Sequence, residues 1–396
     1  NLGQIKTGNV DPFLFNLTGI TLWNYFKQCL TGTSNTFTKN QNIFGKVYFP
    51  SGSDSFTVGW FAFATAFLMR PFGASVFGHI GDKFGRKRAL VLTVSLMGIP
   101  TFMIGALPGY ETIGIFAPIT LVVCRLVQGL CTGGEYNGSA IFALEHVGKS
   151  YPGTTGGMIT GASIVGALGA NIMGYIFTLP DMGPNAWRIP FLLGAVISIV
   201  GLYMRLYIAE SPAFEKLQKR HKVIRSPLTD ALLKHKSAVF LTVIIGMLNG
   251  LLSYTLFKFI NLYLSKFLNV DDHIALEYSS VGLIVYIIAA PLMGFLLDKV
   301  GAKKTLMGAC MFIFLTSLPI FLLIIERSTM SLIIAQIIMA LCVAAIAGPQ
   351  HAFVQTLFPA EDRYSGVAFS FCVGMGIGGG FFPYFMLEVV EKTQYL

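Results

Sequence analysis

Two stretches of the chain repeat one pattern: GHIGDKFGRKR at residues 78–88 and GFLLDKVGAKK at residues 294–304. In each stretch a glycine precedes an aspartate by four positions, a second glycine follows that aspartate by three, and basic residues come last. Each stretch also joins two long apolar segments. A motif repeated at corresponding places predicts a chain built from two similar halves.

The composition is that of a membrane protein. Of the 396 residues, 54% are hydrophobic and only 12% are charged, and the mean hydropathy is +0.67, whereas soluble domains carry about 25% charged residues. Three long segments, 237–257, 305–325 and 328–360, contain no Asp, Glu, Lys or Arg. About 20 apolar residues cross a bilayer, and they do so as a helix. We therefore expect an all-α integral membrane protein, and exclude soluble, disordered and disulfide-rich classes.

Eleven segments are expected to span the membrane. The longest charged connection, 210–236, separates six of them from five. This predicts an N-terminal helical bundle over 1–209, a basic linker over 210–236 and a C-terminal bundle over 237–396. The expected spans are 11–31, 56–80, 89–108, 113–144, 154–179, 187–208, 237–264, 275–297, 305–326, 329–357 and 364–390.

The basic residues are distributed unevenly between the two sides of the membrane. If the N-terminus is cytoplasmic, 16 of the 28 Lys and Arg residues fall in cytoplasmic loops, seven of them in the linker. This asymmetry is the positive-inside pattern, so we expect the basic loops and the N-terminus to lie in the cytoplasm. The net charge of +9 then reflects topology and contact with anionic lipid, and gives no support for nucleic-acid binding.

The paired loops resemble the signature of the major facilitator superfamily. Further motifs are similar to its metabolite:proton symporter family, which includes proline/betaine, citrate, ketoglutarate and shikimate transporters. These motifs are YFPSG at 48–52, RLVQG at 125–129, GGE at 133–135, WRIPF at 187–191 and ESP at 210–212.

The resemblance extends from about residue 47 to 390, and it implies the major facilitator fold of two pseudo-symmetric six-helix bundles. Eleven spans are visible in the sequence, so the resemblance also implies a twelfth span beyond Leu396. It further implies a bacterial inner-membrane transporter that works as a monomer.

The resemblance assigns a gating role to the repeated loops. Asp82 and Arg86 would hold the cytoplasmic side closed, with Arg86 paired to Glu145 at the end of span four. Gly78 and Gly85 would permit close helix approach and the turn itself. Plain topology anchors are the alternative, and we prefer it for the neighbouring basic residues Lys83, Lys87 and Arg88. The second copy keeps Asp298 but has Ala302 where the first has Arg86, so its latch is expected to be weaker.

Span four carries the strongest candidate site. At 100° per residue its polar side chains fall within an arc of about 80° on one helix face. A charge near the bilayer centre costs about 2.5–3.5 kcal/mol, so this face should line a polar cavity or meet partners. Arg125 is suited to bind a substrate carboxylate, and Glu135 to couple protons through a changing pKa. A structural pair with another helix is the alternative for both charges. The polar residues on this arc are Arg125, Gln128, Thr132, Glu135 and Ser139.

Three other residues are weaker candidates. Lys258 in span seven either faces the cavity or extends toward the interface. His351 in span ten either titrates or is simply hydrogen-bonded. Arg70 in span two is as compatible with helix packing as with substrate contact.

Cofactors and enzymatic chemistry find no support. The six Cys residues show no metal-binding spacing, and there is no phosphate-binding loop or hydrolase motif. We therefore expect no cofactor, no metal and no enzyme activity.

The function expected is proton-coupled import of a small organic acid or zwitterionic metabolite by alternating access. Its partners would be that small molecule, protons and the lipid bilayer. A proton-driven exporter of the same fold and a non-transporting sensor are the alternatives. One departure bears on coupling: the family usually carries acids in its first span, whereas the nearest match here, LWNYF at 22–26, has none.

Overall fold

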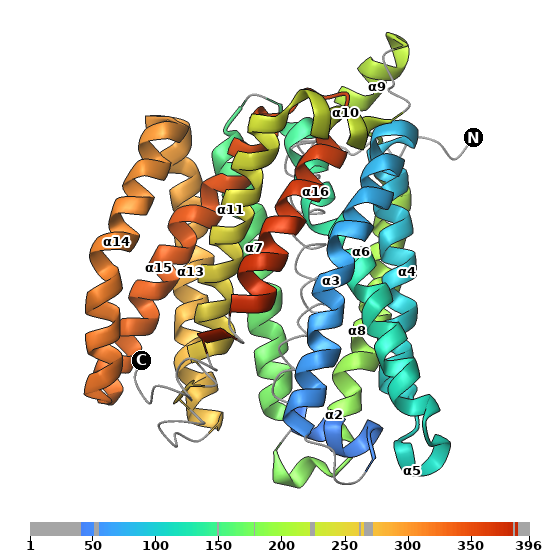
Figure 1. Ribbon diagram of the computed structural model, residues 1–396, viewed down its shortest axis with the longest axis vertical. Coiled ribbons are helices and arrows are strands. Elements are labelled where there is room, and N and C mark those ends of the chain that lie inside the picture. The colour runs from blue at the N-terminus through green and yellow to red at the C-terminus, as the bar shows by residue number, and fades with distance from the viewer. Residues whose placement is uncertain are drawn as a thin grey trace, which may run out of the picture.

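The computed structural model describes residues 41–50, 55–148, 150–177, 179–221, 226–260, 263–264, 272–382 and 385–386, and the regular structure in those ranges is entirely helical (Figure 1). The all-α expectation is therefore confirmed. The long helices are α3 (Ser55–Phe84), α4 (Arg86–Ala106), α6 (Phe116–Val147), α7 (Pro152–Ile176), α8 (Ile189–Tyr207), α11 (Lys236–Tyr254), α13 (Asp272–Val300), α14 (Ala302–Glu326), α15 (Thr329–Thr356) and α16 (Arg363–Gly376).

Shorter helical pieces connect or extend these helices. They are α2 (Gln41–Tyr48), α5 (Tyr110–Ile113), α9 (Pro212–Lys219), α10 (Pro227–Lys234), the 3₁₀ turns η1 (Pro180–Met182) and η2 (Ala186–Arg188), and the π-helical turns η3 (Thr255–Phe259) and η4 (Ile377–Phe381).

The ten long helices correspond to the last ten expected spans, and the first, 11–31, lies outside the described residues. Eight helices of the described part are long and apolar enough to cross a membrane. Spans seven and eleven differ from expectation, because their α-helices end at Tyr254 and Gly376 and continue as π-helical turns. In span eleven the turn is formed by IGGGF, whose glycines favour the α-helix weakly.

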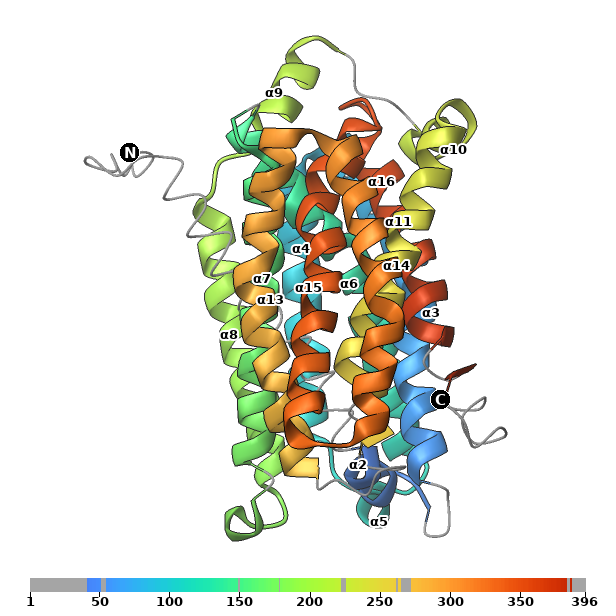
Figure 2. The same cartoon turned by 90° about the vertical axis from the view of Figure 1, so that its left-hand side faces the viewer.

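The long helices pack into two groups, one from each half of the chain, and two pairs of helices connect the groups. In the N-terminal half, α6 packs on α3 and α4, and α4 packs on α8. In the C-terminal half, α15 packs on α13 and α14, and α11 packs on α16. The halves meet where α3 packs on α16 and where α13 packs on α7 (Figures 1 and 2).

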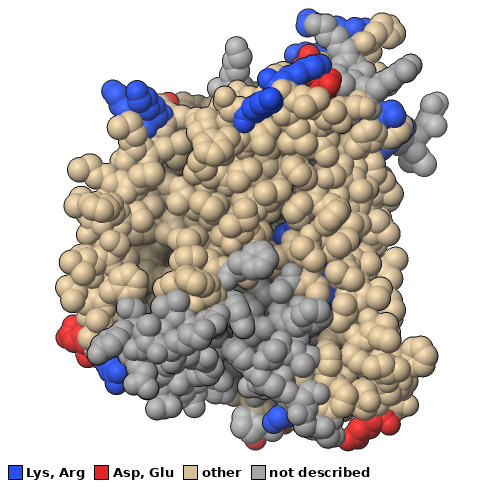
Figure 3. All heavy atoms as spheres, in the orientation of Figure 1, with Lys and Arg blue, Asp and Glu red and all other residues tan. Residues whose placement is uncertain are grey.

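Charge is concentrated at the two ends of the molecule, and an apolar belt separates them (Figure 3). The belt is lined by exposed apolar side chains, especially on α14, where Phe314 is 78% exposed. Such a belt matches the hydrocarbon layer of a bilayer. One end carries α9, α10 and the repeated basic loops (Figures 1 and 3); we call it the basic end.

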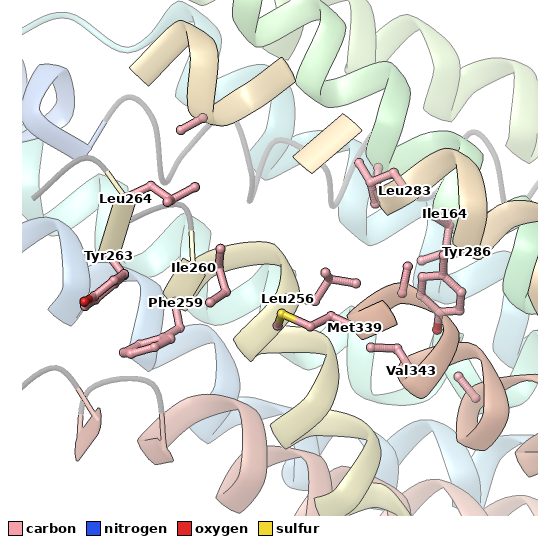
Figure 4. Packing of buried hydrophobic residues seen from close by; sticks show 14 of the residues in the cluster. Ile164, Leu256, Phe259, Ile260, Tyr263, Leu264, Leu283, Tyr286, Met339 and Val343 are labelled. Atoms are coloured by element: carbon pink, nitrogen blue, oxygen red, sulfur yellow. The ribbon is translucent and has the colours of Figure 1, made fainter. Parts of the chain in front are cut away.

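Buried apolar side chains also join the halves within the belt. Ile164 of α7 belongs to the same buried cluster as Leu283 and Tyr286 of α13 and Met339 of α15 (Figure 4). This apolar contact continues the α7–α13 seam toward the middle of the molecule.

The repeated loops have the same backbone conformation. Gly85 precedes α4 with φ 114° and ψ 145°, and Gly301 precedes α14 with φ 91° and ψ 153°. Side chains other than glycine rarely adopt such positive φ values, which explains why both copies of the motif keep this glycine.

Candidate functional site

The carboxylate of Asp82 joins the two halves at the basic end. It is buried at the end of α3 and accepts backbone hydrogen bonds from Tyr364 (3.2 Å) and Ser365 (2.8 Å) in the first turn of α16. Its Oδ1 also lies 3.3 Å from Nη1 of Arg86. Free N–H groups and the helix dipole make a helix N-terminus a favourable place for a carboxylate.

Arg86 extends this connection to α6. It is fully buried, and its Nε lies 3.3 Å from Oε2 of Glu145. Its other nitrogens donate to the carbonyl oxygens of Gly81 (3.0 Å) and Ala360 (2.7 Å). Glu145 in turn lies 3.3 Å from Nη1 of Arg363 in α16. The pair expected from the resemblance is present, and it is part of a network that reaches both halves.

The linker contributes residues to this network that sequence reasoning did not assign to it. Ser211 hydrogen-bonds Glu145 through its hydroxyl, and the ring of Phe214 lies 5.3 Å from the Arg86 guanidinium. Glu210 accepts the backbone N–H of Lys87 (3.1 Å) at the start of α4. The ESP motif was the available signal, but its spacing says nothing about which distant side chains it meets.

Asp298 makes the equivalent connection from the second repeat. Its carboxylate accepts backbone hydrogen bonds from Gly153 and Thr154 and the hydroxyl of Thr154, each at 2.7 Å. Those residues begin α7, so each repeated aspartate binds the first turn of a helix in the other half. Ala302 stands where Arg86 does in the first copy, and among the described residues Asp298 forms no ion pair.

The first glycine of each repeat lies where the helices are closest. A Cβ added to Gly78 would be 2.8 Å from Cα of Ser365, and one added to Gly294 would overlap the carbonyl of Gly153. A larger side chain at either position would separate the helix that carries the aspartate from the helix that binds it.

A second polar contact adjoins the first turn of α16. Nε2 of His235, between α10 and α11, lies 3.3 Å from Oδ2 of the buried Asp362. Burial raises the pKa of the Asp362 carboxyl, and the nearby His235 acts in the opposite direction. No sequence pattern connected these two residues.

Three of the span-four candidates remain close together. Arg125 is buried and donates from Nη1 to Oε1 of Gln128 (2.9 Å). Gln128 donates to Thr101 of α4 (3.0 Å), and Thr132 donates to the backbone carbonyl of Gln128 (2.8 Å). This part of the α6 face is therefore polar within the N-terminal half.

Glu135, on the same arc, has different surroundings. Its carboxylate accepts two hydrogen bonds from Arg205 of α8, at 2.5 and 3.0 Å, and one from the hydroxyl of Thr93 in α4. All three residues are buried in the N-terminal half. The geometry is that of the alternative reading, a pair between helices. The signal for Arg205 was its charge inside the span at 187–208, which requires a partner.

Polar side chains from both halves meet near the middle of the molecule. Nε2 of Gln350 in α15 donates to the hydroxyl of Tyr136 in α6 (3.1 Å), and the buried His351 ring lies 5.2 Å from the Tyr136 ring. We call Tyr136, Gln350 and His351 the central polar region. In the space-filling view Lys or Arg atoms are visible in a recess of the belt (Figure 3).

Two further expectations concern Lys258 and metal binding. Lys258 lies in η3, and its side chain is outside the described residues. Among the described residues no cluster of three or more His, Cys, Asp or Glu is arranged to bind a metal.

Comparison with known proteins identifies relatives over most of the chain. The profile of the Major Facilitator Superfamily matches residues 28–383. The inner membrane metabolite transport protein YhjE of Escherichia coli K12 is 34% identical over 357 residues, which are 86% of this chain and 80% of YhjE. The proline/betaine transporter of the same strain is 32% identical over 372 residues, 89% of this chain and 73% of that protein.

Solved structures share the fold. The proton:xylose symporter XylE superposes with a TM-score of 0.69 at 15% identity, covering 96% of this chain and 88% of that one. An outward-facing bacterial homologue of the iron transporter ferroportin gives a TM-score of 0.69 at 13% identity, covering 97% and 94%.

Proposed function

Because the chain belongs to the major facilitator superfamily and, within it, to the metabolite:proton symporter family, it is a multi-pass membrane transporter, and we propose that it imports a small organic acid or zwitterionic metabolite together with protons. The curated relatives include metabolite and proline/betaine transporters, which supports the class of substrate. Alternating access would carry this substrate between the two helical halves.

One observation carries the proposal: the halves are joined at the basic end by polar contacts between Asp82 and α16 and between Asp298 and α7. Hydrogen bonds to helix N-termini can be exchanged for water at modest net cost. Such contacts suit an end that must open and close in every cycle. With the basic end in the cytoplasm, Asp82, Arg86, Glu145 and Asp298 form the cytoplasmic gate.

Coupling to protons would use one of two buried titratable groups. Glu135 is the only carboxylate in the middle of the long helices by sequence, and His351 lies in the central polar region. A titratable group that is alternately excluded from water and exposed to it changes its pKa, and this change ties proton binding to the conformational cycle. Glu135 would act by releasing Arg205 when it binds a proton, and His351 by binding a proton in the central polar region.

The experiment is uptake into proteoliposomes with an imposed inward proton gradient and a labelled panel of organic acids, amino acids and betaines. We expect gradient-driven accumulation that a protonophore abolishes. Glu135→Gln should lose accumulation but keep counterflow, with His351→Gln as the matched variant. Accumulation by Glu135→Gln would move the coupling role to His351. Absence of gradient-driven flux across the panel would overturn import and favour the exporter or the sensor.

A further inference from the structure

We propose that Tyr364 is a positioning residue of the gate at the basic end: its side chain holds the first turn of α16 against the N-terminal half, where that turn binds Asp82. This inference rests on the proposed function, because it concerns the gate which that function assigns to the basic end. Three features of the molecule support it: the burial of the Tyr364 ring, the glycines that receive it and the different residue at the matching position of the second repeat.

The side chain of Tyr364 crosses from the C-terminal half into the N-terminal half. Tyr364 is fully buried near the start of α16, and its hydroxyl donates to the carbonyl oxygen of Gly134 in α6 (2.9 Å). Its backbone N–H donates to the carboxylate of Asp82 at the end of α3 (3.2 Å). Tyr364 therefore binds α3 through its backbone and α6 through its side chain.

Two glycines leave the space that the Tyr364 ring occupies. A Cβ added to Gly138 of α6 would lie 1.8 Å from the hydroxyl oxygen of Tyr364 and 2.3 Å from its Cζ. A Cβ added to Gly81 of α3 would lie 2.5 Å from Cδ2 of the ring. We call Gly81, Gly134 and Gly138 the tyrosine slot. A ring packed this closely fixes the position of its helix, because densely packed interiors resist displacement.

The matching position of the second repeat carries no side chain. The backbone donors to Asp298 are Gly153 and Thr154, so Gly153 occupies the place at the start of α7 that Tyr364 occupies at the start of α16. A Cβ added to Gly153 would lie 2.2 Å from the carbonyl oxygen of Gly294, because backbone packs on backbone there. The hydrogen bonds to the aspartate thus form at that contact without an inserted ring, and Tyr364 adds to them where α3 meets α16.

Separation of α3 from α16 requires the Tyr364 ring to leave the tyrosine slot. While the ring is in place, the N–H groups of Tyr364 and Ser365 are held at Asp82. Departure of the ring breaks the aromatic packing and these hydrogen bonds together. Packed interfaces have discrete arrangements and do not deform continuously. Closure of the gate therefore depends on the ring as well as on the charges.

The test is the rate of maleimide labelling of Ser365→Cys, buried beside Gly78, in the purified, otherwise cysteine-free full chain. When opening and closing are fast, this rate follows the fraction of molecules that are open. Tyr364→Phe removes one hydrogen bond and should accelerate labelling about two- to tenfold. Tyr364→Leu also removes the ring and should accelerate labelling further.

Tyr48 provides a matched control. It is equally buried, and its hydroxyl donates to the carbonyl oxygen of Ile104 at the same 2.9 Å, but both residues belong to the N-terminal half. Tyr48→Phe should lower the unfolding temperature about as much as Tyr364→Phe does, yet leave labelling within about twofold of the parent, because the two sites are distant. A tyrosine that only stabilised the fold would change the first measurement and leave the second unchanged.

A compensating substitution tests the slot itself. Gly138→Ala places a methyl group where the Tyr364 hydroxyl lies and should accelerate labelling about tenfold or more. In the Tyr364→Leu background the colliding atoms are absent, so the same change should alter labelling less than about twofold. Equal acceleration by Gly138→Ala in both backgrounds, or parent-like labelling of Tyr364→Leu, would overturn the proposal. If Gly138→Ala does not fold, the Tyr364 variants and the Tyr48 control decide.

Failure of the gate and failure of this proposal give different results. If Asp82→Asn accelerates labelling and the Tyr364 variants do not, the gate stands and Tyr364 does not position it. If the Tyr364 variants accelerate labelling but the reconstituted chain shows no gradient-driven uptake, Tyr364 holds the basic end closed and the proposed symport fails.

Discussion

Charged side chains within the long helices differ in the residues that surround them. Glu135 and Arg205 are satisfied by one another, by Thr93 and by the carbonyl of Leu90, all in the N-terminal half. Arg70 instead has a sulfur atom and an aromatic face for neighbours. Glu135 and Arg205 thus join helices within one half, whereas Arg70 faces the other half.

The Glu135–Arg205 pair yields a stability prediction. Glu135→Gln should lower the free energy of unfolding by about 3–5 kcal/mol, because it leaves the Arg205 charge buried without its counter-charge. The double variant Glu135→Gln with Arg205→Gln should recover most of that loss. The measurement is reversible unfolding in detergent, with Asp230→Asn as the control, since the partly exposed Asp230–Lys234 pair should contribute below about 1 kcal/mol. Equal losses in the single and double variants would contradict the pairing.

Sequence reasoning at this scale recognised which residues were unusual and left their partners open. The charge of Glu135 and its place on the α6 face were evident, and so was the need for a partner or a cavity. Arg205 is 70 positions away, and its distance from Glu135 depends on how α8 and α6 each pack on α4. One-dimensional spacing carries no information on such a crossing, so substrate-facing and helix-pairing charges look alike in the sequence.

At the scale of the helices, each copy of the repeated motif contacts a helix of the other half. The end of α3 binds the start of α16, and the end of α13 binds the start of α7. The repeat itself was visible in the sequence, down to the glycines whose positive φ begins α4 and α14. The helix that each aspartate would meet was not, because that depends on the two-fold arrangement of the halves.

The difference between the two contacts is testable. Asp82 binds both α16 and Arg86, whereas Asp298 binds only α7 among the described residues. Asp82→Asn should therefore open the basic end more than Asp298→Asn. The measurement is the rate of maleimide labelling of Ser365→Cys, buried at the α3–α16 contact, in an otherwise cysteine-free chain.

We expect labelling to accelerate several-fold in Asp82→Asn, and by less in Asp298→Asn. The physical reason is that the first change removes a buried charge pair in addition to helix-terminus hydrogen bonds, each of which contributes about 1 kcal/mol or more. The same rate in Asp82→Asn as in the parent would show that these contacts do not hold the end closed.

For the whole molecule, the sequence was sufficient for the fold class. Low charge and long apolar runs identified the helices, and the resemblance identified the major facilitator fold, which the relatives and solved structures bear out. Hydropathy alone did not predict the π-helical turns that follow Tyr254 and Gly376. Average hydropathy is insensitive to such local geometry, and glycines mark only the second turn, IGGGF, since the first, TLFKF, contains none.

The charge asymmetry between the two ends leads to the last prediction, that the basic end faces the cytoplasm. Loops rich in Lys and Arg are retained on the cytoplasmic side during insertion. Lys216 is exposed on α9 at the basic end, and Glu111 is exposed on α5 at the opposite end. In a cysteine-free chain, an impermeant maleimide added to intact cells should label Glu111→Cys and not Lys216→Cys, and permeabilisation should expose both.

The reversed labelling pattern would change the mechanism as well as the topology. The network of Asp82, Arg86 and Glu145 would then close the outer side. Flux measurements would still decide the direction of transport, because importers and exporters that work by alternating access both pass through a state open to the cytoplasm. Labelling two exposed positions therefore tests the premise on which the assignment of the cytoplasmic gate depends.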